Sequence, residues 1–359
     1  MSDKRPATPP PQATLSVVIP NHNHAQFLPQ ALDAIIAQSR AATEVLVIDD
    51  ASEDKSVELL HEYARRHPFI KLYCLEKNVG VVEAMNCGVQ MAGGEYVFLA
   101  SADDEVLPGL FEKSMYWLER FPEAGVCSAL CRTMDERGRD TGLYSSRLVS
   151  REATFLPPQA VASALERHGC WFVGSTSFFK RKGLEQIGGF RPDLGPFVDG
   201  FTQEVLALQH GACFIPEALA RWRVVEAGYS IWLARQTSEY IQRVEYMVEL
   251  MRTTFGGVFS DRYVESRRRE CLYGVGVHAS KNVTAAADLY LSQLARVLSP
   301  VRALDRLILA GVGGGVRSLV LAVNGYLFLR RRRLTTELLR RRLRWLAAQL
   351  TRQTGRGAQ

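Results

Sequence analysis

The segment "LASADDEVLP", residues 99–108, ends an apolar run with two adjacent carboxylates, Asp103 and Asp104. Neighbouring carboxylates repel each other when both are ionised, so we expect this pair to have a positive partner. A divalent metal that carries a phosphorylated ligand would supply that charge, and such a hard cation prefers oxygen ligands. Ser101 stands where a third carboxylate would help to hold the metal. The segment therefore indicates a metal site, and the alternative is a solvated acidic loop.

Two further polar clusters follow apolar runs that predict buried strands. "LSVVIP" (15–20) is followed by "NHN", and "EVLVIDD" (44–50) continues into "ASED". In an open parallel sheet, ligands bind at the carboxyl ends of the strands, which share one edge. Three strand ends therefore predict one ligand site. The alternative for Asp49 and Asp50 is that they end a strand and cap the next helix.

Alternation of strands and helices predicts the scaffold of this site. "IKLYCLE" and "EYVFLA" predict a third and a fourth strand, and helical segments separate all four strands. The first helix carries a continuous apolar face, formed by Phe27, Leu28, Ala31, Leu32, Ile35 and Ile36. Four such alternations predict an α/β fold with a parallel sheet covered by helices on both faces.

The second half of the chain has a mixed pattern. "WFVGSTSFFK" predicts a strand pair, "GLEQIGGF" a short helix, and "DGFTQEVLALQHG" a helix that Asp199 opens. "CFIPEALARWRV" predicts an extended segment, and helical spacing dominates from Ile231 onward. One apolar stripe in that region is formed by Ile241, Val244, Val248 and Met251. We place the boundary between the α/β domain and a helical appendage at residues 225–235.

Composition indicates a folded protein with an unusual basic end. The 359 residues are 47% hydrophobic and 23% charged, and the polar, proline-rich lead-in 1–13 is expected to be disordered. This lead-in lacks the apolar core of a secretory signal, so a cytosolic location is expected. Seven scattered cysteines without a CxxC pair favour reduced thiols over disulfides or a zinc site. Residues 330–359 hold ten arginines and one glutamate, so the rest of the chain is net acidic although the total is +6.

The quoted motifs resemble those of a known family. "SVVIPNHN", "EVLVIDDASEDKS", "NVGVVEAMNCGVQMAGGEYVFLASADD" and "GGF" are similar to family 2 glycosyltransferases in order and spacing. The resemblance covers about residues 15–225 and implies a GT-A fold, with a mostly parallel sheet, over residues 14–228. A helical appendage (229–304) and a helical tail (305–359) would follow as a C-terminal α-helical region. Family members are inverting enzymes that use nucleotide-sugars.

The resemblance also implies roles for individual residues. The donor-binding positions are Pro20, Asn21, His22, Asn23, Asp50, Asn78, Ser101, Asp103 and Arg223, with Arg221 as an alternative to Arg223. Asp50 would accept a hydrogen bond from the base, and Asn78 would reach the ligand from a turn that Gly80 and Asn86 support. Asp103 and Asp104 match the last two acids of the D-x-D-D motif and would hold Mg²⁺ or Mn²⁺, while Ser101 replaces the first acid.

Inverting transfer also requires a base that takes the proton of the acceptor hydroxyl. In the family this acid follows the "GGF" turn, and Asp199 is the best match, with Glu204 and Asp193 as fallback candidates. The usual Glu-Asp pair is reduced here, because Val198 replaces the glutamate. The alternative is that Asp199 only caps a helix, a role worth about 1 kcal/mol.

The C-terminal tail predicts contact with a membrane surface. Residues 307–329 are apolar and long enough to cross a bilayer as a helix, but Arg317 lies in their middle and five glycines weaken the helix. The amphipathic, arginine-rich stretch after them suits an anionic membrane surface, at about 1 kcal/mol for each basic residue. We expect peripheral attachment at the cytoplasmic face; a membrane span and a solvated helix are the alternatives. No nucleic acid is expected, because no aromatic–basic interleaving is present.

The sequence therefore predicts a metal-assisted inverting glycosyltransferase. Its acceptor would be a glycan or a lipid-linked saccharide in the synthesis of a bacterial-type surface or secreted glycan. Two alternatives remain. One is nucleotidyl transfer on a similar sheet, although "PNHNHAQ" is not the glycine-rich basic loop that this chemistry uses. The other is a catalytically weakened protein that binds nucleotide-sugars or tethers a complex to the membrane.

Overall fold

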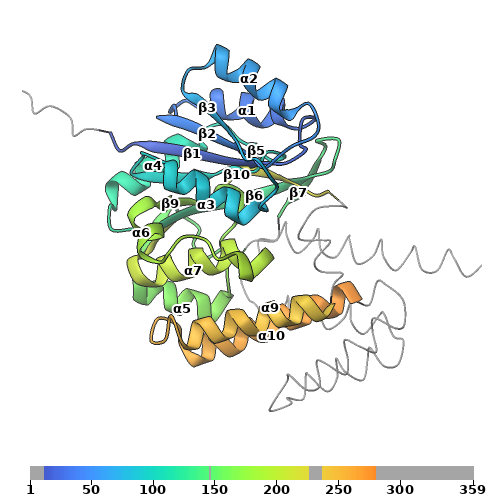
Figure 1. Ribbon diagram of the computed structural model, residues 1–359. Helices are drawn as coiled ribbons and strands as arrows, with labels where there is room; N and C mark the ends of the chain where they lie inside the picture. The colour runs from blue at the N-terminus through green and yellow to red at the C-terminus, as the bar shows by residue number, and fades with distance from the viewer. Residues whose placement is uncertain (1–11, 145–146, 226–236, 280–359) are drawn as a thin grey trace, which may run out of the picture.

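The computed structural model describes residues 12–144, 147–225 and 237–279. Ten strands form one mixed sheet in the order β3-β2-β1-β4-β9-β6-β10-β5, with β7 beside β6 and β8 beside β10 (Figure 1). The first four strands are parallel and agree with the prediction: β1 (Leu15–Asn21), β2 (Glu44–Asp49), β3 (Ile70–Cys74) and β4 (Tyr96–Leu99).

The other six strands extend this sheet. They are β5 (Glu105–Val106), β6 (Val126–Met134), β7 (Asp140–Leu143), β8 (Thr154–Leu156), β9 (Phe178–Lys180) and β10 (Ala212–Arg223). β6 and β10 are parallel to each other, whereas β5, β7, β8 and β9 pair antiparallel. The predicted α/β sheet is thus confirmed as parallel in its first half and mixed in its second half.

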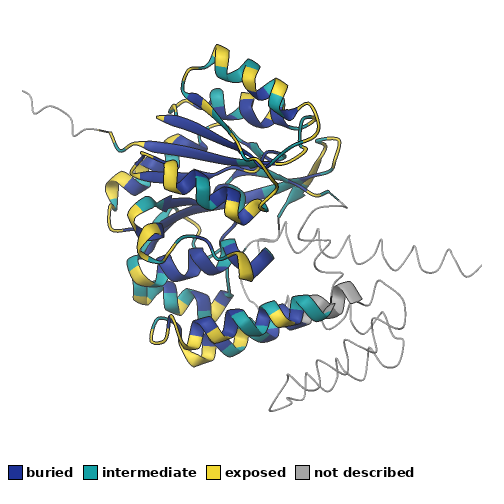
Figure 2. Cartoon of the chain, viewed as in Figure 1, coloured by how far each residue is buried: buried dark blue, intermediate teal, exposed yellow. Residues whose placement is uncertain are grey.

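Helices cover both faces of the sheet, as the alternating pattern predicts. Apolar side chains of α1 (Leu28–Ile36), α2 (Ser56–Arg66) and α4 (Leu110–Arg120) belong to the core on one face. Those of α3 (Val81–Met91), α6 (Arg181–Gln186) and α7 (Val198–His210) belong to the core on the other face. The strands between them are buried along their length, and the helices turn their exposed residues outward (Figure 2).

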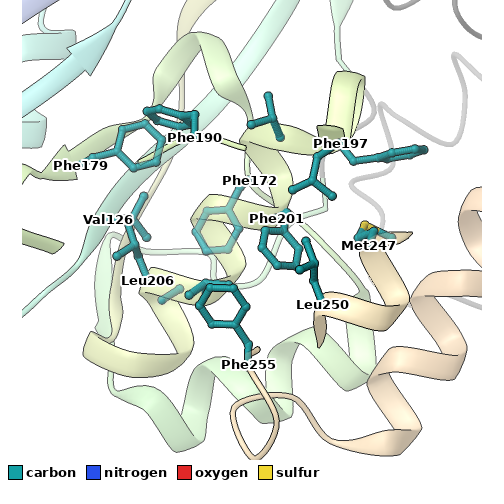
Figure 3. Packing of buried hydrophobic residues seen from close by; sticks show 14 of the residues in the cluster. Val126, Phe172, Phe179, Phe190, Phe197, Phe201, Leu206, Met247, Leu250 and Phe255 are labelled. Carbon is teal, nitrogen blue, oxygen red and sulfur yellow. The ribbon is translucent and has the colours of Figure 1, made fainter. Parts of the chain in front are cut away.

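A second helical layer packs on α7. It comprises α5 (Pro158–His168), α9 (Thr237–Arg252) and α10 (Asp261–Ala279). In Figure 3, Leu206 of α7 lies near Val126 of the sheet, and Phe201 of α7 lies beside Phe255, which follows α9. The four residues of the predicted apolar stripe in α9 are all buried, so this prediction is confirmed. Helix α7 is consequently buried between the sheet and the C-terminal helices.

The segment 171–180 differs from the predicted strand pair. Only β9 is a strand, and the 3₁₀ turn η1 (Gly174–Thr176) precedes it. The Thr176 hydroxyl donates to the Ala129 carbonyl at 2.9 Å and accepts the Ala129 N–H at 3.1 Å. This side chain satisfies both main-chain groups of Ala129, which a neighbouring strand would otherwise bond. The polar "GST" residues therefore form a turn against β6 instead of a ladder.

Helix α7 also begins differently from the prediction. The 3₁₀ turn η2 (Pro192–Phe197) leads directly into α7, so that Phe197 is the N-cap residue. Asp199 lies in the first helical turn and bonds no N–H as a cap. The capping alternative for Asp199 is therefore wrong.

Several predictions fall outside the described residues. These are the lead-in up to residue 11, most of the domain boundary, and everything from residue 280 to the C-terminus, including the apolar and arginine-rich segments. In the described part of the chain, no helix combines the length and the apolar composition that crossing a membrane requires.

Candidate active site

The loops after β1 and β2 are joined by a buried polar network. The Asn21 side-chain amide donates to Asp49 Oδ2 at 2.7 Å, and the Ser52 hydroxyl donates to the same oxygen at 2.7 Å. Asn21 and Asp49 are 2% and 1% exposed, and they are register partners on the parallel strands. Asn21 and Asp49 therefore fix the relative position of the two loops.

His22 and Asn23 add exposed links between the same loops. Nδ1 of His22 donates to the Asp50 carbonyl at 2.8 Å, and this bond defines the ring tautomer, because a carbonyl only accepts. Asn23 has a left-handed backbone (φ 57°), and its Oδ1 accepts the Glu53 N–H at 2.8 Å. Nε2 of His22 accepts the Asn23 side-chain amide at 3.1 Å and is left without a proton to give.

Asp50 fixes the loop that precedes α3. Its two carboxylate oxygens accept the N–H groups of Val79 (2.7 Å) and Gly80 (2.8 Å), and the residue is 2% exposed. Gly80 has φ 90°, a conformation that L-residues with a side chain rarely adopt. The exposed Asn78 accepts the same Gly80 N–H at 3.1 Å. Asp50 thus holds Asn78 at the carboxyl edge of the sheet.

Asn86 has a different role from the predicted support of this turn. It bonds both main-chain groups of Phe190 in the "GGF" segment, at 2.8 and 2.9 Å. Asn86 therefore joins α3 to the segment that leads towards α7.

The acidic loop after β4 carries one buried and one more accessible carboxylate. Asp104 is 6% exposed; the Ser175 hydroxyl donates to its Oδ2 at 2.6 Å, and the Arg223 N–H donates to its Oδ1 at 2.9 Å. Burial, together with the charge of Asp103, raises the pKa of Asp104 to about 7. The exposed Ser101 forms a side-chain hydrogen bond with the Asp104 carboxylate. The pair is thus held close despite its mutual repulsion.

The structure gives Arg223 a supporting position. Its guanidinium donates to the Asp103 carbonyl at 2.7 Å, to the Asp135 and Glu136 carbonyls at 3.2 and 3.1 Å, and to Gln30 at 2.7 Å. It also lies 4.6 Å from the centre of the Phe27 ring, and the residue is 3% exposed. In this conformation Arg223 supports the acidic loop. Its alternative, Arg221, is paired with Glu105 at 2.7 Å.

Asp199 lies against the turn that contacts Asp104. A Cβ atom placed on Gly174 would lie 2.7 Å from Asp199 Oδ2, so the carboxylate packs directly on the main chain of η1. Burial raises the pKa of Asp199 to about 6. Because Ser175 follows Gly174, one short turn contacts both Asp104 and Asp199.

The two fallback acids lie elsewhere. Glu204 is fully buried, accepts the Tyr263 hydroxyl at 2.8 Å and pairs with Arg267 at 3.2 Å. Asp193 is exposed on η2, and its main-chain carbonyl accepts a hydrogen bond from Arg243 at 2.8 Å. Among the three candidates for the base, only Asp199 contacts the turn beside the acidic pair.

The structure therefore brings most of the predicted site residues to one edge of the sheet. Pro20 and Asn21 end β1, Asp50 follows β2, and the acidic pair follows β4, while the turn η1 contacts both Asp104 and Asp199. Sequence reasoning missed Ser175, Gly174 and Gln30. The signal for η1 is the small polar triplet "GST" inside an aromatic run, which interrupts a strand pattern.

The donor atoms at the acidic loop suit a hard divalent cation. The side chains of Asp103, Asp104 and Ser101 offer only oxygen. The pKa of Asp104 is raised by burial and by the charge of Asp103, and a bound cation would offset both effects. Within the described residues, no group of three or more His, Cys, Asp or Glu side chains could hold a metal. The protein side chains thus fit a metal that takes much of its coordination from water or from a phosphate.

The arrangement combines an α/β sheet with paired carboxylates and a separate half-buried acid, which is typical of nucleotide-binding α/β enzymes. A model of the family described as "Glycosyl transferase family 2" matches residues 16–188. An uncharacterized glycosyltransferase of Escherichia coli K12, YibD, is 38% identical over 101 residues, which cover 28% of this chain and 29% of that protein. Another from Nostoc sp., alr2836, is 24% identical over 82% of this chain and 88% of its own length.

Solved structures agree on the fold. The mannosyltransferase PcManGT from Pyrobaculum calidifontis, in complex with GDP-Man and Mn²⁺, has a TM-score of 0.52 at 20% identity, covering 88% of this chain and 86% of that one. TarS from S. aureus has a TM-score of 0.60 at 16% identity, covering 86% of this chain and 55% of that one. Residues 16–188 thus match the family 2 glycosyltransferases, and the described part of the chain has the GT-A fold of these solved structures.

Proposed function

We propose that this protein transfers a sugar, with inversion and with the help of a divalent metal, from a nucleotide-sugar to a hydroxyl of a glycan or lipid-linked saccharide. One observation carries the proposal. The turn η1 contacts Asp104 through Ser175 and Asp199 through Gly174. Inverting transfer needs both functions beside one reaction centre: stabilisation of the leaving diphosphate, and a base on the opposite side of the sugar.

The nucleoside part of the donor is assigned to the ends of β1 and β2. Asn21 Oδ1 is buried and has no hydrogen-bond partner within the described ranges, so it is free to accept one from a ligand. Asp50 accepts two main-chain N–H groups and, as an ionised carboxylate, retains acceptor capacity for a base. GDP-Man is bound by PcManGT and UDP by TarS 1-349, so guanine and uracil nucleotides are the donors to test first.

Asp103 and Asp104 are the residues that would hold Mg²⁺ or Mn²⁺. A divalent cation supplies Lewis-acid stabilisation of the charge that develops on a leaving diphosphate. Asp103 is the more accessible ligand, since Asp104 already accepts bonds from Ser175 and Arg223. Ser175 and Arg223 orient Asp104, and Ser101 is assigned a bond to the ribose or to a water.

Asp199 is assigned the role of general base. It takes the proton from the acceptor hydroxyl while that oxygen bonds to the anomeric carbon and the bond to the nucleoside diphosphate breaks. The carboxylate lies in a desolvated position that raises its pKa to about 6, which brings its basicity closer to that needed near neutral pH. The main chain of Gly174 restricts the position of the carboxylate.

A weakened nucleotide-sugar-binding protein is the second candidate. Ser101 favours it, because this position lacks the first acid of the family motif. Such a protein would bind donor nucleotides and show no turnover.

The decisive experiment combines a donor screen with two variants. Release of nucleoside diphosphate is measured from UDP- and GDP-sugars, with Mn²⁺, Mg²⁺ or EDTA, and with or without lipid-linked saccharide extracts. We expect metal-dependent release that Asp199→Asn reduces at least 100-fold and that Asp193→Asn, the matched control, leaves within about twofold. Undiminished turnover in Asp199→Asn would disprove the base assignment, and nucleotide binding without any turnover would favour the second candidate.

We also propose peripheral attachment to an anionic membrane surface at the cytoplasmic face. The support is the excess of arginine in residues 330–359 together with their amphipathic spacing. A lipid-linked acceptor would be presented at such a surface. This proposal concerns residues outside the described part of the chain.

A further inference from the structure

We propose that three side chains on one face of α10 position the general base: Tyr263, Arg267 and Glu270 are positioning residues for Asp199. The inference rests on the proposed function, because it assigns a purpose to the base. It extends beyond that function by giving a catalytic task to a helix outside the family-matched residues 16–188.

The first contact fixes α7 itself. Glu204, five residues after Asp199 on α7, accepts the Tyr263 hydroxyl at 2.8 Å and pairs with Arg267 at 3.2 Å. Glu204 is 0% exposed, and its Oε2 has no hydrogen-bond partner within the described part of the chain. A buried carboxylate of this kind is costly unless it is paired, so Arg267 is needed wherever Glu204 is present.

Arg267 also reaches the first turn of α7. A Cβ atom placed on Gly200, the residue after Asp199, would lie 3.3 Å from Arg267 Nη2. The same Cβ would lie 3.7 Å from Cys170 Sγ. The guanidinium therefore packs on the main chain beside the base, at a position where the chain has no side chain.

The second contact fixes the segment that leads into η1. Glu270 forms an ion pair with Arg147, whose Nη1 donates to the Cys170 carbonyl at 2.8 Å. Gly169 has φ 73°, and a Cβ there would lie 2.1 Å from Arg147 Nη1 and 3.0 Å from Glu270 Oε2. Gly169 and Cys170 are therefore held by α10 only five and four residues before Gly174.

These contacts converge on both supports of Asp199. Residues 263, 267 and 270 are spaced i, i+4 and i+7, so they share one helical face. That face holds α7, which carries Asp199, and the segment before Gly174, on which the Asp199 carboxylate packs. The charges of this contact balance, because Glu204 pairs with Arg267 and Glu270 pairs with Arg147. A buried ion pair contributes little net stability compared with apolar packing, so its geometric effect is the stronger reason for these residues.

Arg268 provides a matched control on the same helix. It forms a forked pair with Glu245 of α9, at 2.9 and 3.1 Å, and its side chain is 12% exposed, as is that of Arg267. Removing Arg268 weakens the contact between α10 and α9 and leaves the contact with α7 in place.

The experiment compares Arg267→Met, Arg267→Lys, Tyr263→Phe and Arg268→Met in the full chain. Donor turnover is measured as release of nucleoside diphosphate from the donor that the wild type uses best, and binding of that diphosphate with Mn²⁺ by calorimetry. Hydrogen exchange of the amides at residues 198–202 reports the first turn of α7. We expect Arg267→Met to lower kcat at least tenfold, with KM for the donor and the nucleotide affinity within threefold, and to speed exchange at 198–202.

The variants differ in their expected effects. Arg267→Lys should recover part of the lost kcat, because it keeps the charge, and Tyr263→Phe should lower kcat about threefold by removing one bond. Arg268→Met should leave both kcat and exchange at 198–202 unchanged. Equal effects of Arg267→Met and Arg268→Met, or a change in KM alone, would overturn the inference.

A second variant and a second measurement keep the inference testable. If Arg267→Met does not fold, Tyr263→Phe removes only a hydroxyl and still tests the contact through kcat and hydrogen exchange. If the wild type turns over no donor, the proposed function fails, whereas exchange at 198–202 still decides whether α10 orders the first turn of α7.

Discussion

At the scale of single residues, the central feature is the placement of Asp199. A carboxylate in the first turn of a helix is normally solvated, yet this one packs on the main chain of Gly174. Its pKa is raised to about 6 because burial penalises the charged form. The same burial that makes Asp199 a better base also destabilises the folded protein when the group is ionised.

The activity should depend on pH through this group. Asp199 must be ionised to accept a proton, so kcat should rise with pH through about 6 and level off above it. Steady-state release of nucleoside diphosphate between pH 5 and 8, in steps of about half a pH unit, measures this rise of kcat with pH. A flat profile through pH 6 would contradict the assignment of Asp199 as base.

Stability should respond in the opposite direction. The pKa of about 6 in the folded state lies above the ordinary pKa of 3.8, so the folded state binds more protons between these pH values and loses stability as pH rises through them. Asp199→Asn removes this cost and should raise the free energy of unfolding by up to about 3 kcal/mol above pH 7. Near pH 4 the two proteins should be almost equally stable. Urea unfolding of the wild type and of Asp199→Asn, near pH 4 and above pH 7, checks this prediction. The same difference in unfolding free energy at both pH values would refute it.

At the scale of elements, the turn η1 decides how the site is assembled. Strand ends and their acids could be predicted from the sequence, because apolar runs and polar clusters are local signals. The turn could not, because the bonds of Thr176 to Ala129 join residues 47 positions apart. The support role of Arg223 was missed for the same reason: its partners Gln30, Asp103 and Asp135 come from three separate loops or helices.

A side chain on η1 should displace the base. Gly174→Ala places a Cβ 2.7 Å from Asp199 Oδ2, closer than such atoms approach, so the carboxylate must move. We expect kcat to fall at least tenfold while nucleotide binding stays within threefold, measured by turnover and calorimetry. Gly93→Ala is the matched control, since its Cβ would meet its nearest neighbour at an ordinary 3.4 Å. Full activity of Gly174→Ala would mean that Asp199 is not confined by η1.

The loop that carries the acidic pair should depend on Arg223. Arg223→Gln leaves the carbonyls of Asp103, Asp135 and Glu136 without their charged donor. Hydrogen bonds to charged groups contribute about 1.5–3 kcal/mol each, so we expect a loss of about 3 kcal/mol or more in the free energy of unfolding. Arg221→Gln, which breaks one pair with Glu105, should cost about 1 kcal/mol or less. Equal losses in the two variants, measured by urea unfolding, would contradict the support role.

At the scale of the whole molecule, a family 2 domain is joined to helices that complete its core. The parallel half of the sheet and the buried stripe of α9 were predictable from periodicity. The buried charges between α7 and α10 were not, because Glu204 and Arg267 carry no signal that distinguishes them from surface residues. Glu204, predicted as a fallback base, is instead part of this contact.

The tail is expected to act at this scale as well. Removing residues 330–359 deletes ten arginines and should reduce cosedimentation with vesicles containing phosphatidylserine at least tenfold. Binding to vesicles of phosphatidylcholine alone should be weak for both proteins, and about 0.5 M salt should abolish the difference. Undiminished binding of the truncated protein to anionic vesicles would show that residues 330–359 do not attach the protein to the membrane.

The three-residue turn η1 has a consequence for altering this enzyme. Because Ser175 steadies one acid and Gly174 confines another, a replacement intended to change the preferred cation would also shift the group that accepts the proton. Cation preference and the pH dependence of turnover are therefore expected to change together in laboratory evolution. Separating the two traits would require rebuilding this turn itself.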